Sequence, residues 1–368
     1  MRVVVAPDGF GGVLTAREAA EAIARGWSRA RPSDELVLRP LSDGGEGLLE
    51  VVATEHDRRL VVEVAGPLGH PVDAPLLLRA DGSAVVEVSR ACGLDLVPAD
   101  RRNPMPATTY GVGQLIDRAR QQGATRILVG LGGSATVDGG SGALNGLGFR
   151  LRMQDGSGLK VGAADLHRID RVEQGWVGDY RDVEVRLLAD VDAALDEAAP
   201  MFGPQKGATP DQVAQLERAL AIWADVVERD LVEGRRLRDE PGTGAAGGLG
   251  LGLAAGLDAR LVPGAPAVAG LVGLEEALDG ADMVITGEGR LDETSLRGKV
   301  VGHLLQRTGE LGLPLYGVVG VVESGAQLGL AGVEEAAQGG PGERTPGEDP
   351  AAEVAAAAGR LADGLGSP

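Results

Sequence analysis

The chain has 368 residues, of which 43% are hydrophobic and only 2% aromatic, so its core must consist of aliphatic side chains. This length suits two domains better than one. The net charge of −19 argues against binding to a nucleic-acid backbone, although local cations could still admit an anionic small substrate. A single cysteine excludes an internal disulfide bond. No apolar run suits a signal peptide or reaches the ~18 residues of a membrane helix, so we expect a soluble, cytoplasmic protein.

The first elements form a β-α-β unit. The continuous β-branched run 3–6 predicts a strand buried on both faces of a parallel sheet. Thr15 begins a sequence with capping-box spacing, followed by apolar residues with helical period, and residues 36–38 give the next strand. Because ligands of such sheets bind at the carboxyl ends of the strands, the loops that begin at Asp8 and Asp43 should lie at the binding edge.

The pattern changes near residue 63. Residues 60–64 and 72–78 predict a hairpin and residues 84–88 a further strand, so this region should be antiparallel and begin a second domain. We expect the first domain to comprise 1–62 and 272–368, with a flexible connector at 338–350, and the inserted domain to comprise 63–271, of which 105–150 could pack back on the first. Three later helices are predicted: one over 109–120, one that begins after Thr209, and one over the alanine-rich C-terminal segment. Later strands are predicted over 126–130, 183–188, 283–286 and 315–322.

Glycine is unusually frequent, with 59 residues gathered in discrete loops between apolar runs. Glycine backbones let N–H groups approach an anion, and carboxylates and a lysine beside them suit a site for phosphate and a metal ion. This combination predicts an enzyme that handles phosphorylated small molecules. The loops are Asp43–Gly47, Gly130–Gly140, Gly203–Gly207, Gly242–Gly248 and Thr286–Asp292.

Two pairs of carboxylates stand out in or beside these loops. Asp43 and Glu46 lie three residues apart around two glycines, a spacing that suits Mg²⁺, although a turn followed by a glutamate in the first helical turn would look the same. Asp190 and Asp192 follow a predicted strand and should point to one side. They could hold a metal ion, or one could act as general base, or both could simply be a solvated strand end.

Lys206, held between glycines before a well-capped helix, could neutralise phosphate charge, or it could be an ordinary exposed loop lysine. Glu288, Arg290 and Asp292 directly follow the strand 283–286. They could serve a phosphate site, or the arginine could form a local ion pair with its neighbours.

Several common classes of site are excluded. Residues 242–247 match G-x-G-x-x-G but do not follow a strand, and a phosphate-facing loop before a helix at 249–257 fits better. No P-loop occurs, because Gly298-Lys299 lacks the rest of that motif, and the protein-kinase motifs are absent. The four histidines lack metal-ligand spacing. Ser134 does not lie in a G-x-S-x-G elbow, so its hydroxyl and the neighbouring amides are better suited to contact an anion.

Taken together, these motifs resemble those of the glycerate kinase family, whose members phosphorylate D-glycerate with ATP. Each motif alone is weak, but they occur in the family's order up to about residue 320. The matching stretches are Val5–Asp8 with Leu14–Ala16, Asp43–Gly47, Gly66–Gly69, Thr108–Gly111, Gly130–Thr136 with Asp138–Gly140, Phe202–Thr209, Gly244–Gly250 and Ile285–Arg290.

The resemblance implies an α/β fold in which a flavodoxin-like, doubly wound parallel sheet domain is interrupted by an inserted α/β domain with a mixed sheet. It also implies ATP and Mg²⁺, D-glycerate or a related hydroxy acid as substrate, and 2-phosphoglycerate as product. A homodimer is an open alternative, because the sequence does not determine the oligomeric state. Implied catalytic residues are Asp190 (as base), Lys206 and Arg290, and the implied metal ligands are Asp43, Glu46 and Asp292. Residues implied to bind substrate or phosphate are Asp8, Gly132, Gly133, Ser134, Gly244, Gly247 and Glu288, and Asp138 also matches the motif set.

The sequence departs from the family pattern in three places. Gly9 and Gly11 stand where many relatives have serine and lysine, Val137 replaces a usual asparagine, and residues 193–200 replace a longer loop. Two alternatives to the glycerate 2-kinase hypothesis therefore stay open. One is a kinase that acts on another small hydroxy acid or gives 3-phosphoglycerate, and the other is a ligand-binding relative with impaired catalysis.

Overall fold

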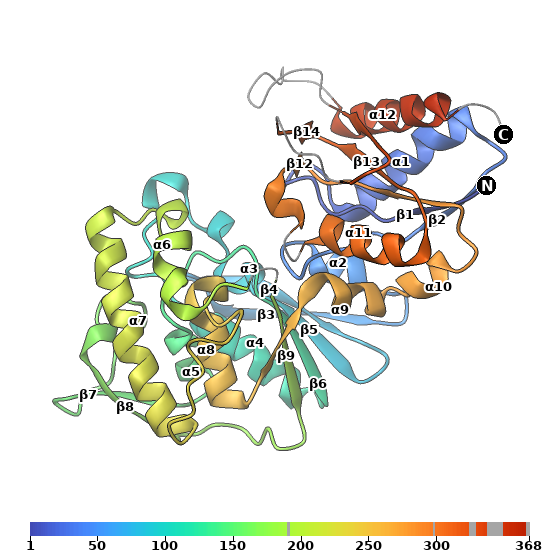
Figure 1. Cartoon of the computed structure of the whole chain (residues 1–368). Coiled ribbons are helices and arrows are strands. Elements are labelled where there is room, and N and C mark those ends of the chain that lie inside the picture. The colour runs from blue at the N-terminus through green and yellow to red at the C-terminus, as the bar shows by residue number, and fades with distance from the viewer. Residues whose placement is uncertain (190–191, 297–298, 324–328, 337–348, 366–368) are drawn as a thin grey trace. The chain divides into compact units, whose positions relative to one another are not determined.

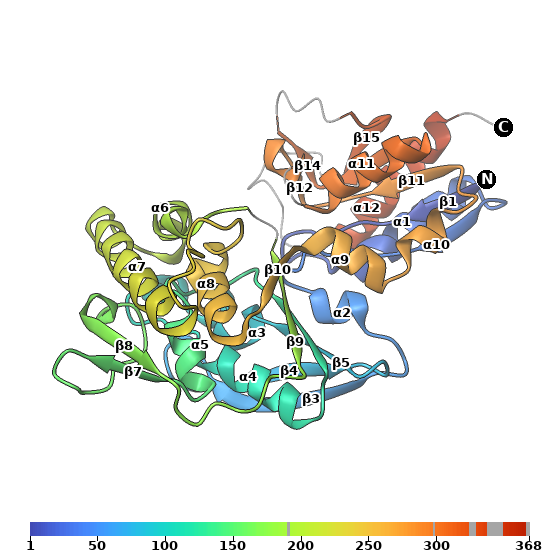
Figure 2. The ribbon, with the colours of Figure 1, turned by 60° about the horizontal axis from the view of Figure 1, so that its bottom comes forward.

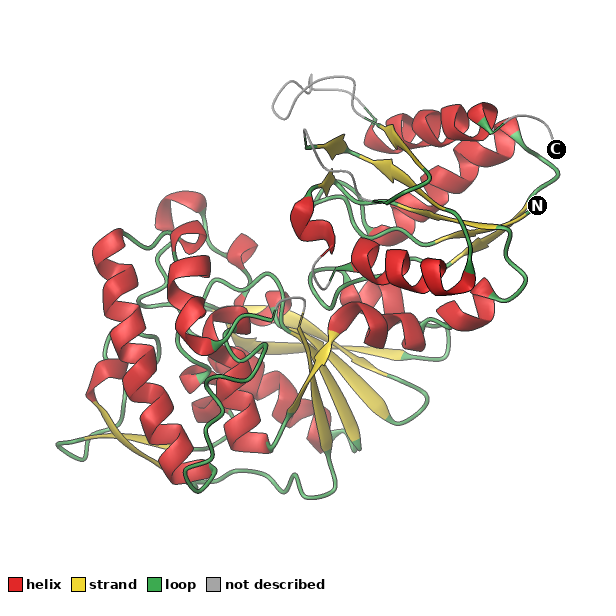
Figure 3. Ribbon diagram, in the orientation of Figure 1, coloured by secondary structure: helices red, strands yellow, loops and turns green. Residues whose placement is uncertain are grey.

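The computed structural model describes residues 1–189, 192–296, 299–323, 329–336 and 349–365. The chain forms two compact units, each with its own sheet and core (Figure 3). The domain boundaries that we expect near residues 62 and 271 stay a prediction. Unit 1 comprises Met1–Asp43, Glu50–Val52 and Gly264–Pro368, and unit 2 comprises Gly44–Leu49 and Ala53–Pro263.

The sheet of unit 1, called sheet A, is five-stranded and entirely parallel. Its spatial order is β2-β1-β11-β13-β15, of which β1, β2 and β13 are labelled in Figure 1. Numbered within the unit, this is the 2-1-3-4-5 order of flavodoxin-like folds, so the expected doubly wound sheet is confirmed. The strands are β1 (Arg2–Val5), β2 (Glu35–Leu38), β11 (Met283–Thr286), β13 (Leu315–Val319) and β15 (Gly332–Glu335).

Helices cover both faces of sheet A (Figure 2). Val3 and Val5 pack in one core with α1 (Ala16–Ala30) and α12 (Pro350–Gly364), whereas Val4 packs in the opposite core. Burial on both faces explains why the three residues of β1 that follow Arg2 are all valine. The expected capping box at the start of α1 is confirmed. The opposite core is formed by α9 (Gly264–Leu271), α10 (Leu274–Leu278) and α11 (Val300–Leu311).

The sheet of unit 2, called sheet B, is mixed and has the order β3-β4-β5-β6-β9-β10. The predicted hairpin is confirmed, and the antiparallel pairing expected for this region extends to its third strand. That strand, β5, pairs antiparallel with β4 and parallel with β6, so β5, β6 and β9 end at one edge. We call it the carboxyl edge of sheet B. The strands are β3 (Arg58–Ala65), β4 (Pro71–Leu78), β5 (Ser83–Glu87), β6 (Arg126–Gly130), β9 (Glu184–Ala189) and β10 (Arg260–Pro263).

One large aliphatic core joins sheet B to the helices of unit 2. The predicted N-terminus of α7 is confirmed, since Thr209 and Gln212 form a capping box around Pro210. The helix expected over 249–257 is confirmed: α8 is assigned from Ala245, but Ala246–Gly248 have a left-handed backbone, so the regular helix begins at Leu249. The helices are α3 (Ser89–Cys92), α4 (Tyr110–Gln121), α5 (Ser141–Gly146), α6 (Ala198–Phe202), α7 (Pro210–Leu231) and α8 (Ala245–Leu257), while α2 (Leu48–Val52) has residues in both units.

Smaller elements complete the described residues. The antiparallel hairpin β7 (Arg150–Met153) and β8 (Ile169–Glu173) belongs to unit 2. In unit 1 the strand expected over 315–322 is interrupted at Gly320, after which β14 (Val321–Val322) pairs with β12 (Arg290–Leu291). The connector expected at 338–350 lies outside the described residues as far as residue 348. Short 3-10 helices span Leu94–Leu96, Ala99–Arg101, Leu166–Arg168, Leu195–Glu197, Pro204–Lys206 and Glu293–Leu296.

Candidate functional site

Unit 1 gathers three carboxylates at the carboxyl ends of its strands. Asp8 follows β1, Asp43 ends the segment after β2, and Glu288 follows β11. Burial raises the pKa of Asp8 well above its ordinary value, and the neighbouring charges of Asp43 and Glu288 raise it further. A hydrogen bond from the Gly9 amide (2.7 Å) and the charge of Lys299 oppose this shift. Such mutual destabilisation of carboxylates is what a bound cation would relieve.

Glu288 is the least satisfied member of this cluster. Burial raises its pKa to about 7, against a hydrogen bond from Ser295 and the charge of Lys299. Its Oε1 atom is buried and accepts no hydrogen bond from the described residues. A buried polar atom without a partner is costly, so this oxygen is suited to a ligand.

Asp292, predicted as a metal ligand, forms a turn instead. Its Oδ1 atom accepts hydrogen bonds from the amide (2.7 Å) and hydroxyl (2.6 Å) of Thr294, and that hydroxyl bond is the main reason why its pKa is lowered. Arg290 is exposed and pairs with Glu323 at 2.8 Å. Asp292 thus has a partner two residues away, whereas Arg290 pairs with a residue 33 positions later. Metal binding by Asp292 and catalysis by Arg290 stay predictions.

Lys299 is a cation of this site that the sequence analysis missed. It lies immediately before α11, donates a hydrogen bond to Thr294 at 3.3 Å, and its charge opposes the rise in the pKa values of Asp8 and Glu288. The sequence contained one signal, a lysine directly preceding a helix in a Gly-Lys pair. We considered that pair only as a fragment of a P-loop.

In unit 2 the glycine-rich loops approach one another backbone to backbone. A Cβ atom added to Gly130 would lie 2.2 Å from the carbonyl oxygen of Gly44, and one added to Gly132 would lie 2.4 Å from the Cα atom of Gly45. The loop 44–47 therefore crosses the carboxyl edge of sheet B in direct contact with the loop after β6. Gly133 is exposed there, as is Glu46, and Ser134 is buried.

Lys206 and Ser134, predicted separately, are in direct contact. The Lys206 side chain is only 3% exposed, and its Nζ atom donates hydrogen bonds to Ser134 Oγ (2.9 Å) and the Thr136 carbonyl (2.8 Å). Burial lowers the pKa of this lysine to about 8. The alternative of an exposed loop lysine is therefore wrong, although contact between Lys206 and a phosphate stays a prediction.

Asp138 is a fully buried carboxylate that shapes the same loop. It accepts hydrogen bonds from the amide and hydroxyl of Thr109 and from the amides of Gly140 and Gly142 at 2.9–3.2 Å. Burial raises its pKa, and these hydrogen bonds partly offset the shift. The preceding Val137 lies in the core, so this departure from the family pattern is accommodated by packing.

Gly244 and Gly247 are buried in backbone contacts of their own. A Cβ atom on Gly244 would lie 2.2 Å from the Ala194 carbonyl oxygen, and one on Gly247 would lie 2.0 Å from that of Thr136. These glycines allow the 242–248 loop to support the loop that carries Ser134, and their contact with phosphate stays a prediction. Asp192 is exposed, and Asp190 lies outside the described residues.

A second residue missed in the sequence is Glu87 at the end of β5. It is fully buried and accepts hydrogen bonds from the amides of Gly47 and Leu49, both at 3.2 Å. The available signal was a lone carboxylate at the carboxyl end of an otherwise apolar strand.

Comparison with known proteins identifies the family. The model of the glycerate kinase family matches residues 3–360. The chain belongs to the glycerate kinase family. It is 39% identical to a glycerate kinase of Halalkalibacterium halodurans, covering 88% of this chain and 86% of that one, and 37% identical to the glycerate 2-kinase of Escherichia coli K12, covering 87% and 85%.

A solved structure agrees with these relatives. The crystal structure of a proposed glycerate kinase 2 from Salmonella typhimurium LT2 is 35% identical and superposes with a TM-score of 0.82, covering 99% of this chain and 98% of that one. Membership of this family makes the protein a kinase, which implies the use of ATP. The two-unit α/β architecture is thus the one expected from the resemblance.

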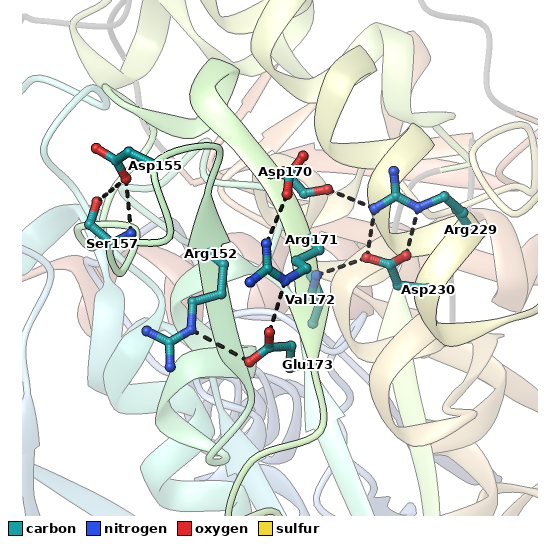
Figure 4. A network of polar contacts seen from close by, with 9 residues as sticks. All are labelled: Arg152, Asp155, Ser157, Asp170, Arg171, Val172, Glu173, Arg229 and Asp230. Atoms are coloured by element: carbon teal, nitrogen blue, oxygen red, sulfur yellow. Dashed lines mark hydrogen bonds and ion pairs between the residues drawn. The ribbon is translucent and has the colours of Figure 1, made fainter.

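Two further observations limit where this glycerate kinase family member could bind ligands. Among the residues that the structure describes, no three carboxylate, imidazole or thiol groups are placed to hold a metal ion by themselves. A charged network at the β7–β8 hairpin is fully paired (Figure 4). There the Val172 amide donates to Asp230 (2.8 Å) and Arg229 donates to the Asp170 carbonyl (2.7 Å), which fastens the hairpin to α7. We assign this network a structural role.

None of the helices in the described part of the chain is long and apolar enough to span a bilayer.

Proposed function

We propose that this glycerate kinase family member transfers the γ-phosphoryl group of ATP to a hydroxyl of D-glycerate and that the product is 2-phosphoglycerate. The observation that carries the proposal is the nearly full-length similarity to the glycerate 2-kinase of Escherichia coli. The geometry agrees, since glycine-rich loops with a buried lysine and separate carboxylates supply the parts that phosphoryl transfer requires.

Phosphoryl transfer depends on positioning and charge neutralisation more than on covalent chemistry. In this proposal the buried ammonium of Lys206 holds Ser134 and the 132–136 backbone in one conformation. Exposed Gly133 and partly exposed Gly132 present the loop to the substrate. Asp190, assigned from the sequence, accepts the proton of the glycerate hydroxyl as it attacks.

The carboxylates of unit 1 fit a hard divalent cation. Mg²⁺ usually takes one or two protein carboxylates and completes its shell with water and substrate phosphate, so a cluster without three ready ligands is sufficient. Asp43 and one neighbouring carboxylate, either Asp8 or Glu288 through its unpartnered Oε1 atom, would hold it. When bound, the ion would neutralise phosphate charge.

One departure supports a second candidate, a kinase for another small hydroxy acid or one that gives 3-phosphoglycerate. The shortened segment after Asp192 is packed tightly, because the Ala193 carbonyl accepts hydrogen bonds from the amides of Gly242 (3.1 Å) and Gly244 (3.0 Å). A rigid, short segment beside the proposed base could change which hydroxyl is presented. A homodimer and a cytoplasmic location remain part of the proposal from the sequence.

An ATP- and Mg²⁺-dependent assay tests the proposal. D-glycerate and a panel of other hydroxy acids are compared, and phosphorus NMR identifies the phosphorylated carbon. Preferred turnover of D-glycerate at its 2-hydroxyl supports the proposal, whereas preference for another acid or formation of 3-phosphoglycerate favours the second candidate.

A further inference from the structure

Glu87 occupies an unusual position for a carboxylate. It is the last residue of β5 and is fully buried at the carboxyl edge of sheet B. Its Oε1 atom accepts hydrogen bonds from the Gly47 amide (3.2 Å), the Ser89 hydroxyl (2.8 Å) and Arg90 Nε (3.0 Å). Its Oε2 atom accepts one from the Leu49 amide at 3.2 Å. A single side chain thus receives four donors from two separate segments.

The first segment is the loop 44–47 and the start of α2. Gly47 has a left-handed backbone and provides no side-chain cap, so the first amides of α2 lack a partner within the helix itself. Glu87 supplies that partner from 38–40 positions further along the chain. The carboxylate therefore fixes where α2 begins and where the exposed Glu46 emerges from the loop.

The second segment is the turn after β5, which contacts the loop that carries Ser134. The Val88 amide donates to the Gly130 carbonyl (3.1 Å), and the Leu94 amide donates to the Gly133 carbonyl (2.9 Å). A Cβ atom on Gly133 would lie 3.0 Å from the Cβ atom of Ser89. Glu87 therefore lies at the junction of the two glycine-rich loops of unit 2.

Only a carboxylate meets these demands. All four partners are donors, and an ionised carboxylate accepts hydrogen bonds without presenting a donor of its own. Arg90, which is about one-third exposed, balances the buried charge. Removal of the charge would leave backbone amides without acceptors at a buried site, which is costly.

We propose that Glu87 is a positioning residue for the kinase reaction, which fixes the 44–49 segment against the Gly130–Ser134 loop so that both loops face the substrates in one arrangement. The proposal rests on the proposed function for its catalytic consequence. Its structural part, a local tether, can be tested separately. A displacement of about 1 Å at reacting groups can lower a rate ~100-fold, so loss of the tether should affect turnover strongly.

The test compares Glu87→Gln, which keeps the size of the side chain but replaces one acceptor by a donor, with Glu63→Gln. Glu63 is exposed on β3 of the same sheet and is the matched control. Hydrogen–deuterium exchange is measured by mass spectrometry for peptides that cover 44–52 and 126–130, together with melting temperature and steady-state kinetics. Ser89→Ala, which removes one donor to the same oxygen, is a milder second variant.

We expect Glu87→Gln to speed exchange in 44–52 about tenfold while 126–130 stays protected. We expect kcat to fall about 10–100-fold. Ser89→Ala should show the same pattern to a smaller degree, and Glu63→Gln should show none. Should Glu87→Gln fail to fold, Ser89→Ala carries the comparison.

Unchanged exchange in 44–52 would overturn the proposal, as would uniform loss of protection across both peptides. Faster local exchange with unchanged kcat would also overturn it, because the tether would then not serve catalysis. If the wild-type protein does not phosphorylate D-glycerate, the proposed function fails alone. The exchange comparison still decides the tether, and the kinetic comparison then uses whichever hydroxy acid the enzyme accepts.

Discussion

The buried ammonium of Lys206 donates a hydrogen bond to the hydroxyl of Ser134, 72 positions earlier in the chain. The contact ties the 203–207 loop to the loop after β6 and holds a cation against Ser134 and Thr136 of that loop, next in sequence to the exposed Gly133. A positive charge held by burial in a fixed place is suited to a developing phosphate charge, because no reorganisation is needed during the reaction.

Replacement of this lysine should therefore harm activity more than folding. For Lys206→Met we expect kcat/KM to fall about 100-fold, the loss typical when one preorganised electrostatic contact is removed. The exposed Lys160, changed to methionine, is the control and should stay near wild type. Steady-state kinetics on folded protein, checked by circular dichroism, would contradict this account if Lys206→Met stayed within twofold of wild type.

The raised pKa of Glu288 predicts a pH-dependent stability. Its ordinary pKa is 4.5, and burial in the folded protein raises it to about 7. Between these values the folded state retains a proton that the unfolded chain has lost, so this group makes the free energy of unfolding fall as pH rises from 4.5 to about 7. Glu288→Gln removes the effect.

Relative to wild type, Glu288→Gln should therefore gain stability as pH rises from 5 to 7.5, by at most about 3 kcal/mol. Urea unfolding at both pH values measures the gain, and the exposed Glu293, changed to glutamine, is the control in the same segment. If the difference in free energy of unfolding between Glu288→Gln and wild type did not change with pH, the pKa of Glu288 would not be raised in the folded protein.

The close contact at Gly44 predicts a steric penalty that can be separated from backbone strain. Gly44 has φ +95°, and an added Cβ atom would lie 2.8 Å from the Cβ atom of Leu188, whereas Gly123 has φ +86° and open space around it. Either alanine variant should lose about 1–2 kcal/mol for the left-handed backbone. Gly44→Ala should lose roughly 1–3 kcal/mol more through overpacking. If Gly44→Ala and Gly123→Ala lowered the free energy of unfolding by the same amount, the close packing of Gly44 against Leu188 would be contradicted.

Asp190, which lies outside the described residues, is the base that we assign from the sequence. Asp190→Ala should abolish turnover while ATP still stabilises the protein against heat, because binding does not require the base. The control is Asp192→Ala, which changes an exposed side chain two residues later and should retain most of the activity. Near-normal kcat for Asp190→Ala would remove that role.

Local signals in the sequence predicted the fold well. The β-branched run of β1, the capping boxes of Thr15 and Thr209, and the hairpin β3–β4 all depend on residues close together in the chain, and all are confirmed. The parallel partner of β5 was not predicted, because β6 lies about 40 residues further on and nothing in β5 specifies it. Strand pairing of this kind is a property of the assembled sheet.

In the candidate site, too, the sequence indicated residue types within single loops but not contacts between distant segments. Residue types in glycine-rich loops pointed to Ser134 and Lys206, but their mutual contact and burial depend on tertiary packing. Glu87 and Lys299 were missed because each acts on residues that are distant or in another loop. Conversely, Arg290 and Asp292 matched a motif, yet in the structure Arg290 pairs with Glu323 and Asp292 accepts hydrogen bonds from Thr294.

The decisive measurement is the phosphorus NMR spectrum of the product formed when the purified protein is incubated with ATP, Mg²⁺ and D-glycerate. We expect a 2-phosphoglycerate signal that requires all three components. ATP-dependent thermal stabilisation without phosphorylation of D-glycerate would rule out the proposed glycerate 2-kinase activity.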